Sequence, residues 1–183
     1  MEKTLRKAAI KLTKETVFIL FTVGLAVLLP QALHLMGNAF NVGGALGQIF
    51  LPMYLPILII GFYRGPISGA VAGLLAPLVS FGLTAMPQSA VLPFVTIELI
   101  VTGLFAGAFS KVKLPAVLRV FTVQVLAKAV RVVAVALSLY LASGKVVGSA
   151  LFAGILTSVP GVLLQIVIVS LLVARKEKKA NEQ

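Results

Sequence analysis

The sequence predicts an all-α integral membrane protein, folded as one bundle of six transmembrane helices with both termini in the cytoplasm. Three observations support this fold class. The chain is 60% hydrophobic, with a mean hydropathy of +1.10 and only 11% charged residues, outside the range of soluble domains. Its 183 residues accommodate about six spans of ~20 residues. Its basic residues also gather on one side of the predicted spans. We therefore treat residues 1–183 as a single membrane domain.

The first element is a basic segment followed by a long apolar run. Residues 1–16 carry five basic side chains among apolar ones, a pattern typical of an amphipathic lead-in lying on an anionic leaflet. Span one follows from Val17 to about Leu35. A signal peptide is disfavoured because the run is long, ends without an Ala-x-Ala site and precedes five more apolar segments. Thr22 and Ala26 form a small-xxx-small pair within it.

The next two spans meet at a tight turn, Arg64-Gly65-Pro66. Span two, from about Ile49 to Tyr63, is short and contains two prolines, which a membrane bundle tolerates when neighbouring helices satisfy the freed carbonyls. Span three runs from Pro66 to about Thr84. Glycines recur every fourth residue here, which removes side chains along one face and lets another helix approach closely. The glycines expected at helix contacts, including a pair in span four, are Gly65, Gly69, Gly73, Gly103 and Gly107.

The second half of the chain supplies the last three spans. They are expected at about Ala90–Phe109, Val117–Ala142 and Gly148–Ala174, the last one interrupted by Pro160-Gly161. Residues 175–183 then form a solvated cytoplasmic tail.

The distribution of basic residues predicts the topology. Of the 16 lysines and arginines, five precede span one, Arg64 and three others lie in two connections on the same side, and four lie in the tail. The opposite side has only Lys145. Because cytoplasmic loops are enriched in Lys and Arg, this asymmetry predicts that both termini are cytoplasmic. It also explains the net charge of +11 without nucleic-acid binding.

Three charged residues lie within spans: Glu98, Lys128 and Arg131. A charge near the bilayer centre costs about 2.5 kcal/mol or more, so these groups should face the bundle interior and be paired. Glu98 and Arg131 are at similar depth, and Gln124 shares a face of span five with both cations. Three interpretations remain open: a structural ion pair, a pocket whose residual positive charge binds a phosphate or carboxylate, or a snorkelling Lys128 with no ligand role.

Other polar residues near the outer ends of the spans are further candidates for substrate contact. Tyr54, one of them, is also explained as an interfacial anchor. The set comprises His34, Asn41, Gln48, Tyr54 and Gln88. With no cysteine, no P-loop motif and a single histidine, the chain is not expected to be an enzyme or to hold a metal or cofactor.

The chain resembles the substrate-binding S components of energy-coupling factor (ECF) vitamin transporters. The resemblance rests on six short spans, a basic lead-in, a long first outer loop, and Gly-x-x-x-Gly-x-x-x-Gly-x-x-x-Pro after a proline-rich second span. It implies capture of a vitamin from outside a bacterial cell membrane and association with a membrane coupling subunit and two cytoplasmic ABC-type ATPases. That family docks its coupling subunit on Ala-x-x-x-Ala in span one, where this chain has Thr22 and Ala26.

The sequence leaves the substrate and one competing class open. Gly-Gln-Ile-Phe-Leu-Pro-Met-Tyr-Leu-Pro and Leu-Thr-Ala-Met-Pro look most like S components assigned to cobalamin or related corrinoids, and pantothenate is the alternative vitamin. A self-sufficient proton-coupled transporter using Glu98 is the competing class, and a scaffold without a ligand is a further one. The halves show no convincing inverted repeat, which disfavours a secondary transporter.

Overall fold

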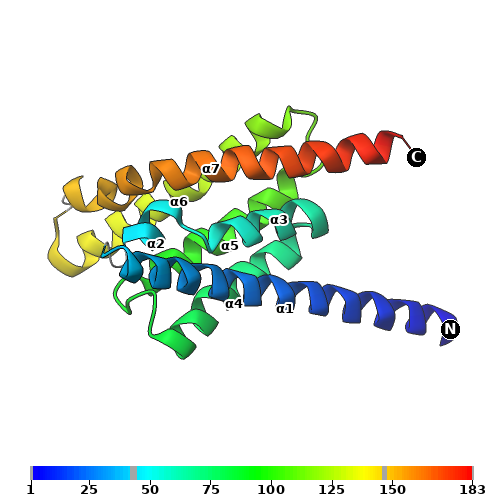
Figure 1. Ribbon diagram of the computed structural model, residues 1–183, viewed down its shortest axis with the longest axis horizontal. Helices are drawn as coiled ribbons and strands as arrows, with labels where there is room; N and C mark the ends of the chain where they lie inside the picture. Colours follow the sequence, from blue (N-terminus) through cyan, green and yellow to red (C-terminus); the bar gives the residue numbers. More distant parts are fainter. Residues whose placement is uncertain (1, 42–44, 146–147, 183) are drawn as a thin grey trace.

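The computed structural model describes residues 2–41, 45–145 and 148–182, and all regular structure in these ranges is helical (Figure 1). The helices are α1 Glu2–Ala39, α2 Ala45–Phe50, α3 Tyr54–Arg64, α4 Pro66–Thr84, α5 Leu92–Phe109, α6 Ala116–Ser143 and α7 Gly148–Asn181.

Five of these helices, α1, α4, α5, α6 and α7, contain a stretch long and apolar enough to cross a membrane. Helix α3 is also apolar but has only 11 residues, and the six-residue α2 precedes it. The chain therefore has the architecture of a multi-pass α-helical membrane protein. The predicted second span is divided into two helices at Leu51-Pro52-Met53, so one of its two prolines lies at a break and the other, Pro56, lies within α3.

Helices α1, α3, α4, α5, α6 and α7 run in alternating directions, and both chain ends lie at the same end of the bundle (Figure 1). We call this the termini end. We call the opposite end, which holds the connections after α1, α4 and α6, the loop end. Helix α3 lies between α1 and α7 and also contacts α4 and α5. Two buried apolar clusters form the core, one on each side of α3.

Glycine determines how closely α4 and α5 approach, and these two helices make the most extensive contact in the fold. A Cβ atom on Gly69 would overlap the backbone of Gly103, and one on Gly103 would overlap that of Gly69. Gly73 lies in the same way against Leu99, and Gly107 against the turn before α4. The predicted glycine-mediated packing is confirmed at these four positions.

Gly65 has a different role from the one predicted. It lies in the turn before α4, with φ of 104°, and a Cβ there would meet open space. The left-handed conformation, rather than close packing, requires glycine at this position.

The ends of the chain are more continuous than predicted. The lead-in and span one form a single helix, α1, and α7 continues through Pro160-Gly161 and through most of the predicted tail. The predicted interruption is wrong because one proline removes a single helical hydrogen bond, which a membrane helix tolerates. Gly161 lies against the backbone of Ile49 and Phe50 and allows α2 to approach α7.

Candidate functional site

Four side chains from three helices form a buried ionic cluster, which we call the charge cluster. Glu98 of α5 is at its centre. Its Oε1 accepts a hydrogen bond from Lys128 Nζ at 2.6 Å, and its Oε2 accepts one from Arg131 at 2.8 Å, both from α6. Tyr54 Oη of α3 donates to Oε2 at 2.7 Å. The predicted proximity of Glu98 and Arg131 is confirmed.

Burial differs sharply across the charge cluster. Glu98 has no exposed surface, whereas the side chains of Lys128 and Arg131 are 12% and 19% exposed. One carboxylate faces two cations, so the cluster has a formal charge of +1. The acid is thus enclosed by its donors, while the cations extend toward the surface of the chain.

Local structure explains how these side chains meet. Lys128 and Arg131 are three residues apart and lie on one face of α6, facing α5. Tyr54 is the first residue of α3, and the break before it directs its ring into the bundle. Lys128 Nζ also lies 5.1 Å from the centroid of that ring, within cation–π range.

Two interpretations from the sequence need correction at this site. Tyr54 is not an interfacial anchor, since it is only 3% exposed and bonds to Glu98. Lys128 does not snorkel free of partners, because its ammonium group is paired with the carboxylate. The sequence signal for Tyr54 was its place directly after Leu-Pro-Met, where a helix must restart inside an apolar segment.

Gln124 was expected to join the charge cluster, but it belongs to a separate polar link. Its Nε2 donates to Gln165 Oε1 of α7 at 2.6 Å. Gln165 Nε2 in turn donates to the carbonyl oxygens of Phe50 and Leu51, at 3.1 and 3.0 Å. These carbonyls lie at the break between α2 and α3, where the regular helical hydrogen bonds are interrupted. The Leu51 carbonyl also accepts the Tyr54 N–H at 3.1 Å, so Gln165 adds a side-chain partner at this break.

Replacing Gln165 with leucine is expected to destabilise the fold by about 2–3 kcal/mol, because the buried Gln124 amide and the Phe50 carbonyl would lose their side-chain partner. The measurement is the thermal midpoint of the detergent-purified protein, followed by size-exclusion chromatography. Gln88→Leu, at an exposed loop position, is the control. Equal midpoints for the two variants would contradict the role of Gln165.

The predicted site residues of the loop end stay apart from the charge cluster in the part of the chain described. Asn41 lies in the turn after α1 with φ of 57°, and the backbone oxygen of Gln88 accepts hydrogen bonds from Val91 and Leu92 at the start of α5. The imidazole of His34 lies beside Gly47 of α2. Gln48 belongs to α2, and its side chain lies outside the described set. The side-chain partners of Glu98 are Tyr54, Lys128 and Arg131, so a binding role for these loop-end residues stays a prediction.

Thr22 and Ala26 face the interior of the bundle. Ala26 has no exposed surface, Thr22 is 8% exposed, and the Thr22 hydroxyl donates to the carbonyl of Phe18. In this conformation the pair serves the packing of α1 and presents little surface to a partner. A docking surface on α1 would have to use a different face of the helix.

A second ionic group, at the termini end, was missed from the sequence. Arg119 is 2% exposed and bonds to Glu177 of α7 at 2.5 Å and to the Ser110 carbonyl at 2.9 Å. It ties the turn between α5 and α6 to α7. The described residues contain no group of three potential metal ligands.

These features define a class: a multi-pass helical membrane protein with a buried cluster of excess positive charge. No family model, no curated protein and no solved structure matches the chain.

Proposed function

We propose that this chain is a substrate-capturing membrane subunit, and that the charge cluster binds the anionic group of a small solute. The observation that carries the proposal is the imbalance around Glu98. A structural pair needs one cation, yet two cations contact this carboxylate and both reach the surface. Since unbalanced charge inside a membrane is costly, a phosphate or carboxylate from a ligand would neutralise the excess.

The position of the cluster is compatible with capture from outside the cell. Glu98 is six residues from the loop-end start of α5, or ~9 Å along the helix axis. Most basic residues lie toward the termini end, so the positive-inside rule favours cytoplasmic termini and an outward-facing loop end. Helices α2 and α3 together would then serve as the sixth span.

Within this class, we favour an S component of an ECF-type vitamin importer in a bacterial cell membrane. The short, broken second span and the glycine-packed third and fourth spans support it, as does the sequence resemblance. The substrate would be cobalamin or a related corrinoid, with pantothenate as the alternative. The partners would be a membrane coupling subunit and two cytoplasmic ABC-type ATPases.

Substitution of Arg131 is expected to weaken solute binding without unfolding the chain. In Arg131→Ala, Glu98 keeps Lys128 and Tyr54, while the cluster loses its excess charge. A lost charged hydrogen bond corresponds to a roughly tenfold to hundredfold rise in Kd. The measurement is equilibrium binding of the captured vitamin to each purified variant.

Lys145→Ala is the matched control, because it removes one exposed positive charge at the loop end. Its Kd should equal that of the wild type. If Arg131→Ala bound the vitamin as tightly as Lys145→Ala, the charge cluster would not be the binding site.

Uptake into proteoliposomes separates the S component from a self-sufficient transporter. The chain alone should bind solute but should not accumulate it when a proton gradient is imposed. Gradient-driven accumulation by the wild-type chain would instead establish proton-coupled transport, and its loss in Glu98→Gln at an equal amount of folded protein would assign the coupling to Glu98.

A further inference from the structure

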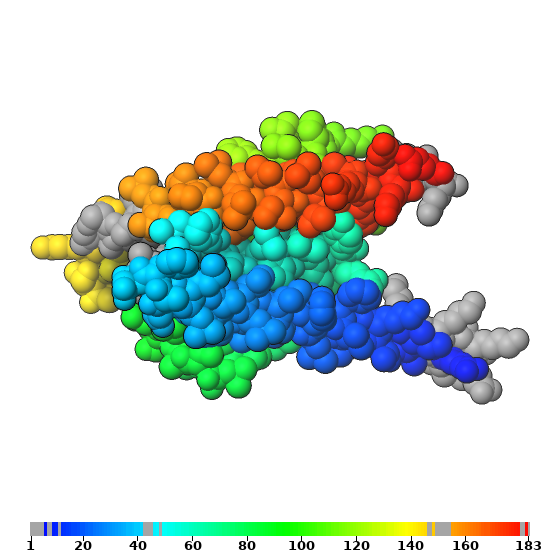
Figure 2. Space-filling view, in the orientation of Figure 1, coloured from blue at the N-terminus to red at the C-terminus, as the bar shows by residue number. Residues whose placement is uncertain are grey.

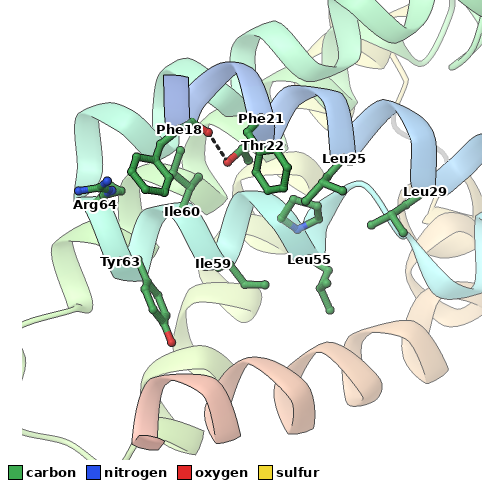
Figure 3. A pocket seen from close by; sticks show the side chains of 11 residues that line it. Phe18, Phe21, Thr22, Leu25, Leu29, Leu55, Ile59, Ile60, Tyr63 and Arg64 are labelled. Atoms are coloured by element: carbon green, nitrogen blue, oxygen red, sulfur yellow. Dashed lines mark hydrogen bonds between the residues drawn. The ribbon is translucent and has the colours of Figure 1, made fainter. Parts of the chain in front are cut away.

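An apolar groove runs along the side of the bundle, on the face where α3 is recessed between α1 and α7 (Figure 2). Its volume is about 390 Å³. Phe18, Phe21, Leu25 and Leu29 line it from α1, and Leu55 and Ile59 line it from α3 (Figure 3). From Phe18 to Leu29 the groove follows α1 for ~16 Å, about half of a ~30 Å hydrocarbon core.

A basic hollow lies next to the groove at the termini end. Its volume is about 520 Å³, and its lining includes Arg175, Lys176, Lys178 and Lys179 of α7. One carboxylate, Glu182, also lines it and is paired with Lys178 at 3.9 Å, so four cations face one acid. Tyr63 lines both the groove and the hollow, and its hydroxyl donates to the Leu172 carbonyl of α7 at 2.9 Å, so the two are adjacent and share this side chain as a wall. An apolar surface and a positively charged one therefore lie next to each other.

The hollow contains one lysine held by protein groups and two cations that are available to a ligand. Lys176 Nζ is held by the Phe62 carbonyl at 3.1 Å and lies 4.6 Å from the centroid of the Tyr63 ring. Arg175 and Lys179 are exposed and form no ion pair within the described residues. Arg64 lines the groove at the same end.

We propose that this surface binds one anionic phospholipid of the surrounding membrane. Its phosphate would occupy the basic hollow, between Arg175 and Lys179, and one acyl chain would lie in the apolar groove. An anionic lipid is the occupant that satisfies both parts, because basic pockets beside membrane helices attract anionic headgroups and the groove is one leaflet deep. This inference is independent of the solute bound at the charge cluster.

The test measures lipid binding to the detergent-purified chain by native mass spectrometry. Phosphatidylglycerol and phosphatidylcholine with identical acyl chains are compared. Phosphatidylglycerol should bind at least about tenfold more tightly, given the contribution of each nearby cation. Arg175→Gln combined with Lys179→Gln should remove this preference. Lys111→Gln combined with Lys113→Gln, which removes the same charge in the turn after α5, should preserve it.

The binding of the acyl chain is tested by filling the groove with a larger side chain. Leu25→Trp should weaken phosphatidylglycerol binding, whereas Leu28→Trp, at a more exposed α1 position outside the groove lining, should not. Glycerol phosphate, which has no acyl chains, should not compete. The proposal is overturned if the two double variants reduce phosphatidylglycerol binding equally, if Leu25→Trp has no effect, or if glycerol phosphate displaces the lipid.

Discussion

Glu98→Gln is expected to destabilise the protein more than any other single change in the charge cluster. The wild-type cluster has a formal charge of +1, and removal of the carboxylate raises it to +2. Breaking a buried pair by removing one partner costs about 3–5 kcal/mol, and the slight exposure of both cations places the expected loss near the lower figure. The measurement is the thermal midpoint and the yield of monodisperse protein in detergent.

A double variant separates charge from packing at this position. Glu98→Gln with Arg131→Gln has one cation and no acid, so it restores the formal charge of +1. We expect it to recover part of the stability lost in Glu98→Gln alone. A double variant less stable than Glu98→Gln would contradict the electrostatic explanation.

Gly69→Ala is expected to produce the second large effect, by forcing α4 and α5 apart. The added Cβ would overlap the backbone of Gly103, and backbone cannot move aside as a flexible side chain can. Overpacking of this kind costs about 1–3 kcal/mol and here should reach the upper figure. The measurement is the free energy of unfolding, determined by titrating a denaturing detergent into mixed micelles.

Gly82→Ala is the control in the same helix. A Cβ at Gly82 meets open space, and alanine is the better helix former by up to about 1 kcal/mol. The control should therefore be neutral or stabilising. Destabilisation of both variants to the same extent would show that the close approach of α4 and α5 is not the cause.

Periodic features of the sequence predicted most of the fold. Apolar length located the long helices, and the bounds of α4 agree with those expected for span three. The four-residue spacing of Gly69 and Gly73 predicted a face without side chains, because helical geometry places such residues in one row. The proximity of Glu98 and Arg131 followed from their depth along two adjacent antiparallel helices.

Features that depend on a third element were not predictable in this way. Spacing put Gln124 on one face with Lys128 and Arg131, but the position of Gln165 on α7 decides its partner. The same holds for Thr22 and Ala26, whose spacing indicates close packing but does not specify the partner helix. Pro160-Gly161 resembled an interruption because α2, which packs against Gly161, is distant in sequence.

The most direct test of the account is equilibrium binding of a panel of vitamins to the wild-type chain alone. The panel should include cobalamin, a corrinoid precursor and pantothenate, each measured with the protein in detergent and without any ATPase. We predict that one vitamin with a phosphate or carboxylate group binds tightly, with one molecule per chain. If no member of the panel binds, the proposal that this chain captures a vitamin is contradicted.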